Sequence, residues 1–228
     1  MGLGHSPSIV MDGLQIALDA ANKRSYPGSG NTWYDLRGNI NFALENSPPF
    51  LANSAGGSIG FTAANSHSAL SSTNLSVLTR FSVEVWHYYT GVNVGNAATL
   101  VTEVFPGNTS RINYNLGGIS GFSDLRIAFY NASWRNSDPY TLTANAWYHI
   151  VGSYDGSNFR LYINSVNQIT TANGFTPGAN TAGIRLMKRW DSGAYWGGHL
   201  STVKIYNRAL SAAEVLQNYH ATKKRYGF

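Results

Sequence analysis

Residues 147–163 read WYHIVGSYDGSNFRLYI, and this stretch decides the fold class of the chain. In its second half the apolar residues Phe159, Leu161 and Ile163 lie two positions apart, which is the spacing of a half-buried strand. Before them, residues 155–158 read Asp-Gly-Ser-Asn, and an Asp-Gly pair favours the left-handed turn of a β-hairpin. The stretch therefore predicts two antiparallel strands joined by a tight turn.

The same alternation recurs in short segments that Gly, Asn, Ser and Pro separate. It is clear in residues 14–19 and 81–85, and we expect a late strand over residues 198–206. The pattern predicts an all-β sandwich of two antiparallel sheets.

The faces predicted for the late strand are Leu200, Thr202, Lys204 and Tyr206 on one side, and Ser201, Val203 and Ile205 on the other. Loops are expected at residues 91–98, 106–121 and 171–181.

One short helix is expected near the end of the chain. Ser211 is a good N-cap, Glu214 completes a capping box, and Leu210 can pack against Val215. The helix should run to about His220, with the basic tail close to its negative end. We expect a single domain over residues 1–228, in which 1–12 form an N-terminal extension and 211–228 form the helix and basic tail.

The composition favours polar, uncharged partners. Charged residues make up 12% of the chain and aromatic residues 13%, and the net charge is +5. Such a surface suits glycans or neighbouring protein subunits. The basic clusters are too short to predict nucleic-acid binding. No segment has the length of a membrane helix or the pattern of a signal peptide, so we expect neither a membrane partner nor export.

Several segments, in order, resemble the concanavalin A-like lectin and laminin G-like (LamG) domain family, in the form found in bacteriophage virion proteins. The resemblance covers most of the chain and implies a jelly-roll sandwich, with Trp86 and Trp147 as core aromatics. It is carried by residues 13–14, 18–22, 25–30, 32–36, 81–86, 147–156, 161–164 and 203–214.

The sequence departs from this family at residues 61–67, where relatives often carry Phe-Asp-Gly followed by a further acidic residue. Here the carboxylates that help to hold calcium are missing, so calcium is not predicted at this position. The six histidines are scattered and predict no metal site. We therefore expect no cofactor.

Catalysis by this fold requires two carboxylates that flank a glycosidic bond. Glu84 is the only carboxylate of its strand and is expected to face solvent, and Glu103 and Asp124 lie on other segments. We therefore predict no catalytic residue and expect a protein that is not an enzyme.

The candidate binding residues lie in two segments that mix aromatic and polar side chains, residues 130–138 and 188–195. Sugar rings stack on Trp and Tyr, while Asn, Asp and Arg bond the hydroxyl groups. The alternative is that Trp134 or Trp190 caps the core or an interface between subunits. The predicted carbohydrate-binding residues are Trp134, Arg135, Asp138, Trp190, Asp191 and Tyr195.

Three hypotheses for function remain. The first, which the resemblance implies, is a structural protein of a bacteriophage virion that is made in the host cytoplasm: a capsid decoration, fibre or tail component. Its partners would be other virion proteins or itself as a homo-oligomer, together with host surface glycans. The second is a free-standing lectin. The third is a divergent polysaccharide hydrolase, which needs a carboxylate pair in a cleft.

Overall fold

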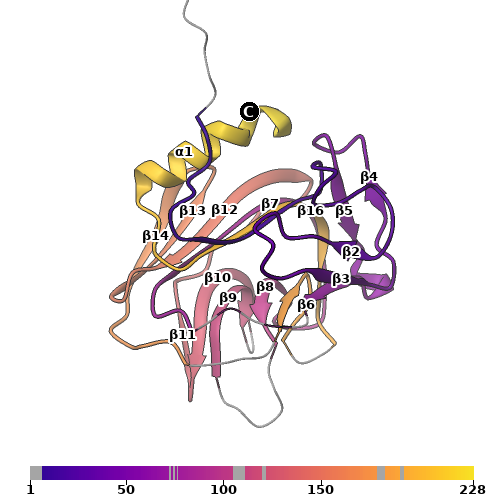
Figure 1. Ribbon diagram of the computed structural model, residues 1–228. Coiled ribbons are helices and arrows are strands. Elements are labelled where there is room, and N and C mark those ends of the chain that lie inside the picture. Colours follow the sequence, from indigo (N-terminus) through magenta and orange to yellow (C-terminus); the bar gives the residue numbers. More distant parts are fainter. Residues whose placement is uncertain are drawn as a thin grey trace, which may run out of the picture.

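Two antiparallel sheets pack face to face in the computed structural model, which confirms the predicted all-β sandwich (Figure 1). The structure describes residues 7–71, 73, 75, 77–104, 111–119, 122–178, 183–190 and 193–228. A single α-helix of the described residues lies outside the sandwich, on one of the two sheets.

Sheet A lies beneath the helix. Its strands, in spatial order, are β14 (Val166–Ala172), β13 (Asn158–Ile163), β12 (Ala146–Tyr154), β7 (Phe81–Val94), β16 (Tyr195–Tyr206), β5 (Ser58–Phe61) and β4 (Phe50–Leu51). β1 (Leu14–Asp19) pairs with the second half of β16.

Sheet B forms the other layer. Its strands, in spatial order, are β11 (Trp134–Asn136), β10 (Phe122–Asn131), β9 (Arg111–Ile119), β8 (Thr99–Glu103), β15 (Ile184–Leu186), β6 (Ser68–Ser71), β3 (Phe42–Glu45) and β2 (Thr32–Trp33). A 3-10 turn, η1 (Ala63–Asn65), connects β5 of sheet A to β6.

The hairpin predicted from residues 147–163 is confirmed as β12 and β13. Tyr154 pairs with Phe159 across the turn, and Gly156 adopts a φ of 97°, which a side chain would disfavour. The carboxylate of Asp155 accepts hydrogen bonds from the backbone N–H groups of Ser157 and Asn158. The turn is therefore closed by the carboxylate of Asp155 and by the left-handed backbone of Gly156, as the Asp-Gly pair predicts.

The main core lies between the sheets and is formed by alternate residues of facing strands. Phe81, Val83 and Val85 of β7 are buried in the same cluster as Ile127 and Phe129 of β10. The burial of such apolar side chains is the main stabilising term of a sandwich of this kind.

All three expected loops contain strand residues, although residues 171–181 include only the last two residues of β14. β7 extends to Val94, and residues 111–119 form β9, where Ile112, Tyr114 and Leu116 are all fully buried. The sequence signal was misleading because Gly117, Gly118 and several Asn residues interrupt the apolar pattern. Gly117 is needed there, since a Cβ at this position would lie 2.6 Å from the Cα of Thr99 on β8.

The predicted faces of the late strand are wrong at its start. β16 is irregular between Leu200 and Thr202, where its register with β7 shifts. Leu200 therefore shares the inter-sheet core with Val203 and Ile205, whereas Ser201 bonds the carbonyl oxygen of Gly57. A bulge of this kind reverses the alternation and leaves little trace in the sequence.

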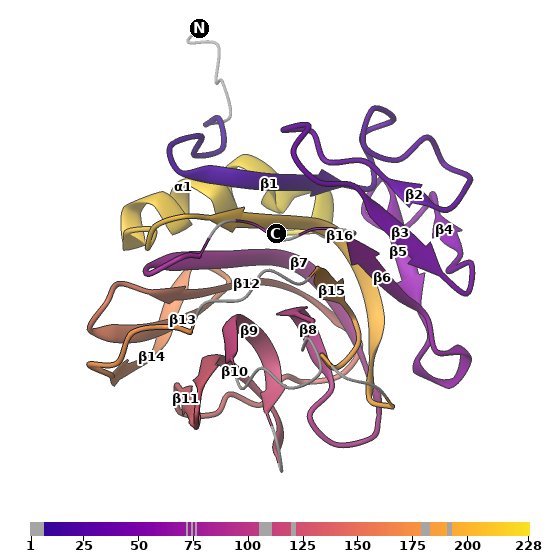
Figure 2. The ribbon, with the colours of Figure 1, turned by 60° about the horizontal axis from the view of Figure 1, so that its bottom comes forward.

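The predicted helix is confirmed as α1 (Ala212–Thr222), which ends two residues beyond His220. Ser211 and Glu214 make both hydrogen bonds of the capping box. The 3-10 turn η2 (Lys223–Tyr226) follows, and Arg225 forms an ion pair with Asp19 at 3.0 Å. The helix and the tail thus lie against the outer face of sheet A (Figures 1 and 2).

Trp86 and Trp147 are not part of the core between the sheets, contrary to expectation. Trp86 is buried on the outer face of sheet A, where its ring stacks on Tyr226 with centroids 3.7 Å apart. Its indole Nε1 donates to Thr222 Oγ1 at 2.8 Å. Trp147 packs against this same cluster. These aromatics therefore hold the end of the chain to the sheet.

The expectation that Glu84 faces solvent is wrong, because α1 covers this side chain completely. Lys204, its direct neighbour on β16, donates from Nζ to Glu84 Oε1 at 2.6 Å, and Asn218 of α1 donates to Oε2 at 2.6 Å. His149 Nε2 lies 3.1 Å from Oε1. Burial alone would raise the pKa of Glu84, but Lys204 and His149 favour the ionised form and hold the pKa below its usual value.

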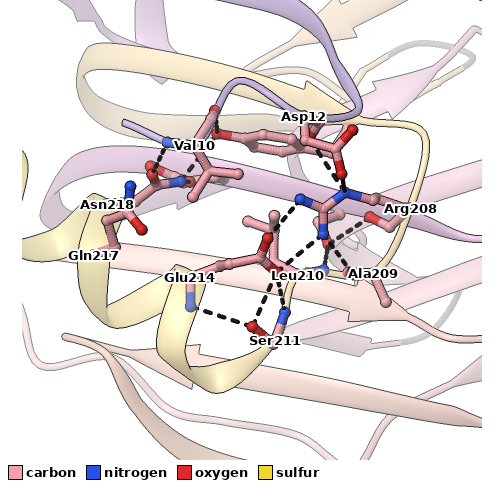
Figure 3. Close-up of polar contacts among 12 residues, drawn as sticks. Val10, Asp12, Arg208, Ala209, Leu210, Ser211, Glu214, Gln217 and Asn218 are labelled. Carbon is pink, nitrogen blue, oxygen red and sulfur yellow. Dashed lines mark hydrogen bonds and ion pairs between the residues drawn. The ribbon is translucent and has the colours of Figure 1, made fainter. Parts of the chain in front are cut away.

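The N-terminal segment is bound to the same helix (Figure 3). The backbone N–H of Val10 donates to Asn218 Oδ1 at 2.7 Å, and Tyr206 donates to the carbonyl oxygen of Val10. Arg208 joins Asp12 at 2.8 Å to Glu214 at 2.6 Å. The two ends of the described chain therefore support each other.

We expect Glu84→Ala to destabilise the fold by about 3–5 kcal/mol, because it leaves the Lys204 ammonium buried without its counter-ion. Urea unfolding at neutral pH measures this loss. Adding Lys204→Met to Glu84→Ala should recover a large part of it. Asp12→Ala is the control, since the Asp12 side chain is 85% exposed and its ion pair should contribute little. A loss for Glu84→Ala no larger than that of Asp12→Ala would contradict this account.

A pH dependence follows from Glu214. Its hydrogen bond to Arg208, with further bonds to Ser211, lowers the pKa of Glu214 from 4.5 to about 2. The ionised carboxylate therefore stabilises the fold above about pH 4.5, and this contribution is lost as the pH falls toward 2. Because Glu214 is partly exposed, we expect a loss of about 1 kcal/mol.

The stability advantage of the native chain over Glu214→Gln should therefore shrink between about pH 6 and about pH 3. Urea unfolding at the two pH values measures it, and Arg208→Gln should reduce the same pH dependence. An advantage that stays constant over this range would contradict the assignment.

Candidate functional site

The two predicted binding segments meet at one end of sheet B. Trp134 opens β11, directly after the turn from β10, and Trp190 lies in the connection between β15 of sheet B and β16 of sheet A. Their ring centroids are 4.9 Å apart, and Tyr130 contacts Trp134 edge-on at 5.2 Å. The structure thus joins two segments separated by more than fifty positions in the sequence.

The two tryptophans of this cluster differ in exposure. Trp190 is 6% exposed and packs against Ala97 and Ile112, with the guanidinium of Arg189 over its ring at 4.8 Å. Trp134 is only half-buried. Trp190 therefore supports the cluster from below, and Trp134 presents an aromatic surface to solvent.

A pocket of about 440 Å³ lies beside Trp134, between the edge strands of the two sheets. β11 is the last strand of sheet B and β14 the last of sheet A, and both lie toward the same side of the molecule (Figures 1 and 2). The pocket is lined by Trp134, Arg135, Asn136, Ser157, Ala172, Asn173, Gly174 and Phe175.

Arg135 and Phe175 face each other in this pocket. The guanidinium carbon of Arg135 lies 3.4 Å from the centre of the Phe175 ring, which places the cation on an aromatic face. Phe175 is 52% exposed, which is unusual for so large an apolar side chain. Together with Trp134, this pair gives the pocket two aromatic rings and a cation.

Asp138 connects the two edges and is not among the residues that line the pocket. Its backbone N–H donates to Thr171 Oγ1 at 3.0 Å, and Thr171 donates to Asp138 Oδ2 at 3.0 Å. Asn131 donates to the carbonyl oxygen of Thr176 at 3.2 Å. These bonds hold the segment after β14 against sheet B, and so fix the width of the pocket.

Tyr195 does not join this site. Tyr195 forms a bridge with Lys188, whose Nζ lies 5.1 Å from its ring. A hydrogen bond from Ser66, followed by the influence of Lys188 and Arg185, lowers the pKa of Tyr195. Tyr195 thus contacts the β6 and β15 side of sheet B. Asp191 lies outside the described residues.

Sequence reasoning missed the half of the pocket that follows β14. Asn173 and Phe175 were not among the candidates, although residues 171–181 were expected to form a loop, and neither was Ser157 of the turn between β12 and β13. The available signal was a large aromatic residue, Phe175, within a run of Asn, Gly and Thr. A large aromatic residue in a loop is not expected to reach the core between the sheets, and it is therefore a candidate for a binding surface.

The structure does not pair the carboxylates that a hydrolase would need. Glu84 lies on the outer face of sheet A beneath α1, whereas Glu103 and Asp124 belong to sheet B. Glu103 is 1% exposed and accepts a hydrogen bond from the backbone N–H of Asn113 at 2.5 Å. Glu84 and Glu103 are thus used within the fold.

Within the described residues, no group of three or more His, Cys, Asp or Glu side chains is arranged to hold a metal ion. No helix in this part of the chain is long and apolar enough to cross a membrane.

A family model described as the concanavalin A-like lectin/glucanases superfamily matches residues 61–216. No curated protein matches the chain. Domain 4 of an extracellular GH43 arabinanase from Geobacillus stearothermophilus, solved with arabinotriose, is similar in structure, with a TM-score of 0.70 at 18% identity. That match covers 90% of this chain and 98% of the arabinanase domain.

Two longer proteins contain a similar domain. The Trypanosoma rangeli sialidase, solved with the inhibitor DANA, has a TM-score of 0.65 at 13% identity, with 96% of this chain and 34% of the sialidase covered. The binding domain of botulinum neurotoxin DC, solved with SialylT, has a TM-score of 0.66 at 13% identity, with 92% and 51% covered. The chain thus spans a third of the former and half of the latter.

Proposed function

Since the chain belongs to the concanavalin A-like lectin/glucanases superfamily, we propose that it is a non-enzymatic carbohydrate-binding protein. The pocket between β11 and the segment after β14 is the proposed site. The observation that carries this proposal is Trp134, a half-buried indole at the rim of a pocket that combines polar side chains with a second aromatic ring, Phe175. Aromatic faces of this kind stack on the C–H groups of sugar rings.

The polar lining of the pocket suits a sugar. Asn136, Ser157 and Asn173 supply amide and hydroxyl groups, and Arg135 supplies guanidinium N–H donors. A few polar groups that converge beside an aromatic surface fix the orientation of a ligand, as binding pockets require. The arabinanase domain and the neurotoxin binding domain, solved with arabinotriose and SialylT, support a glycan as the ligand.

The proposal of a non-enzymatic role rests on the carboxylates. A retaining glycosidase needs two carboxyl groups about 5 Å apart in its cleft, and an inverting one needs them about 6.5–9.5 Å apart. The lining of the proposed pocket contains no Asp or Glu among the described residues. The hydrolase hypothesis therefore has no support at this site.

We further propose that the protein works as a structural component of a bacteriophage particle and attaches there to other virion proteins or to copies of itself. The support is the resemblance of segments such as residues 147–156 and 203–214 to domains of virion proteins. A free-standing lectin is the alternative. Association of the chain with purified particles separates the two.

We expect Trp134→Ala to weaken glycan binding at least about tenfold, because about 1.4 kcal/mol of stacking energy corresponds to that factor. A glycan array together with host-cell polysaccharide, each with and without a calcium chelator, provides the measurement. Tyr34→Ala is the matched control, since Tyr34 is 44% exposed and lies outside the pocket. Absence of binding by the folded native chain would contradict the carbohydrate proposal and favour a particle-building role.

A further inference from the structure

Within the described residues Arg135 has no counter-ion, unlike the three arginines Arg160, Arg208 and Arg225. Arg160, Arg208 and Arg225 form ion pairs at 2.5, 2.6 and 3.0 Å. Within the described structure, Arg135 forms no ion pair and its guanidinium rests on the Phe175 ring instead. A cation held in this way keeps its charge and its planar donor edge available to a ligand.

Two N–H donors of the pocket residues are left without an acceptor. Arg135 Nε and Asn173 Nδ2 are both buried, and neither has a hydrogen-bond partner in the described part of the chain. An unsatisfied buried donor costs about 1–3 kcal/mol, and more when the group is charged. Both residues line the same pocket. A small rotation of either side chain would therefore bring its donor to the acceptor oxygens of a ligand in the pocket.

The acidic side chains next to the pocket have other partners. Asp155, just before the lining residue Ser157, forms an ion pair with Arg160 and accepts two backbone N–H bonds. Asp138 accepts a hydrogen bond from Thr171. The charge of Arg135 is therefore not matched by these carboxylates, and the chain as a whole carries a net charge of +5.

We infer that the pocket binds an acidic sugar and that Arg135 holds its anionic group, while Trp134 stacks on the sugar ring. This inference rests on the proposed carbohydrate-binding function and names the class of glycan. The planar guanidinium fork matches a carboxylate, as in a uronic or sialic acid, and it also binds a sulfate ester. Asn173 supplies a further donor to the same anion.

The test is isothermal titration calorimetry of the full chain with polygalacturonate, polysialic acid and heparan sulfate fragments. Each is compared with its carboxyl-reduced or desulfated counterpart, which separates carboxylate from sulfate as the recognised group. Arg135→Gln, Arg135→Lys and Trp134→Ala are the site variants. Arg24→Gln is the matched control, because it removes the same charge from an exposed position outside the pocket.

We expect at least one acidic member to bind, its neutral counterpart to bind at least tenfold more weakly, and Arg135→Gln to lose about tenfold or more. Arg135→Lys should lose less than Arg135→Gln because it keeps the charge, and Arg24→Gln should bind like the native chain. Urea unfolding of each variant confirms that the fold is retained.

Equal affinity for acidic and neutral forms would overturn the acidic-sugar inference. If that equal binding still required Trp134, the proposed carbohydrate-binding function would stand. Equal losses in Arg135→Gln and Arg24→Gln would also overturn the inference. Absence of binding to every member of the panel would overturn the acidic-sugar inference, and the glycan array then decides whether the carbohydrate-binding function stands.

Discussion

The buried carboxylate of Glu84 makes the contacts on which the packing of α1 and of the N-terminal segment against sheet A depends. An ionised group without water needs charged or hydrogen-bonding partners, and Glu84 takes them from β16, β12 and α1 through Lys204, His149 and Asn218. Asn218 also binds Val10 and Tyr206. One network therefore connects the N-terminal segment, the centre of sheet A and the last helix.

The packing of α1 against sheet A limits where a ligand can bind. The outer face of sheet A beneath α1 is filled by the helix, by the Trp86 and Tyr226 stack, and by the apolar cluster around Val215. The candidate pocket lies away from this face, at an edge of the sandwich. There Asp138, Thr171 and Asn131 hold β11 and its neighbours to β14 and the segment that follows it, and the pocket opens between them. A site built on two linked edges of a rigid sandwich is well suited to hold a fixed arrangement of side chains.

The fold was predictable where one physical signal acts over a short distance. The Asp155-Gly156 turn, the period-two strands and the Ser211–Glu214 capping box each depend on residues close in sequence. The burial of Glu84 was not predictable, because the residue that covers it, Asn218, lies 134 positions away. The bulge near Leu200 and the strand β9 were hidden for a related reason, since a local irregularity or a run of Gly and Asn breaks the period.

The candidate site was predicted in part. Trp134 and Arg135 line the pocket, and Trp190 supports Trp134, but the sequence does not reveal that two distant segments meet. Phe175 and Asn173 come from a third segment, which reaches the pocket only because the edges of the two sheets approach each other.

The location of the glycan site can be tested by nuclear magnetic resonance of the isotope-labelled chain during titration with a bound glycan. We expect the largest chemical-shift changes at the Arg135 side-chain N–H, the Trp134 indole N–H and the amides of residues 172–175. Changes centred instead on a second pocket, lined by Leu51, Phe61, Val92 and His199 on sheet A, would contradict this location.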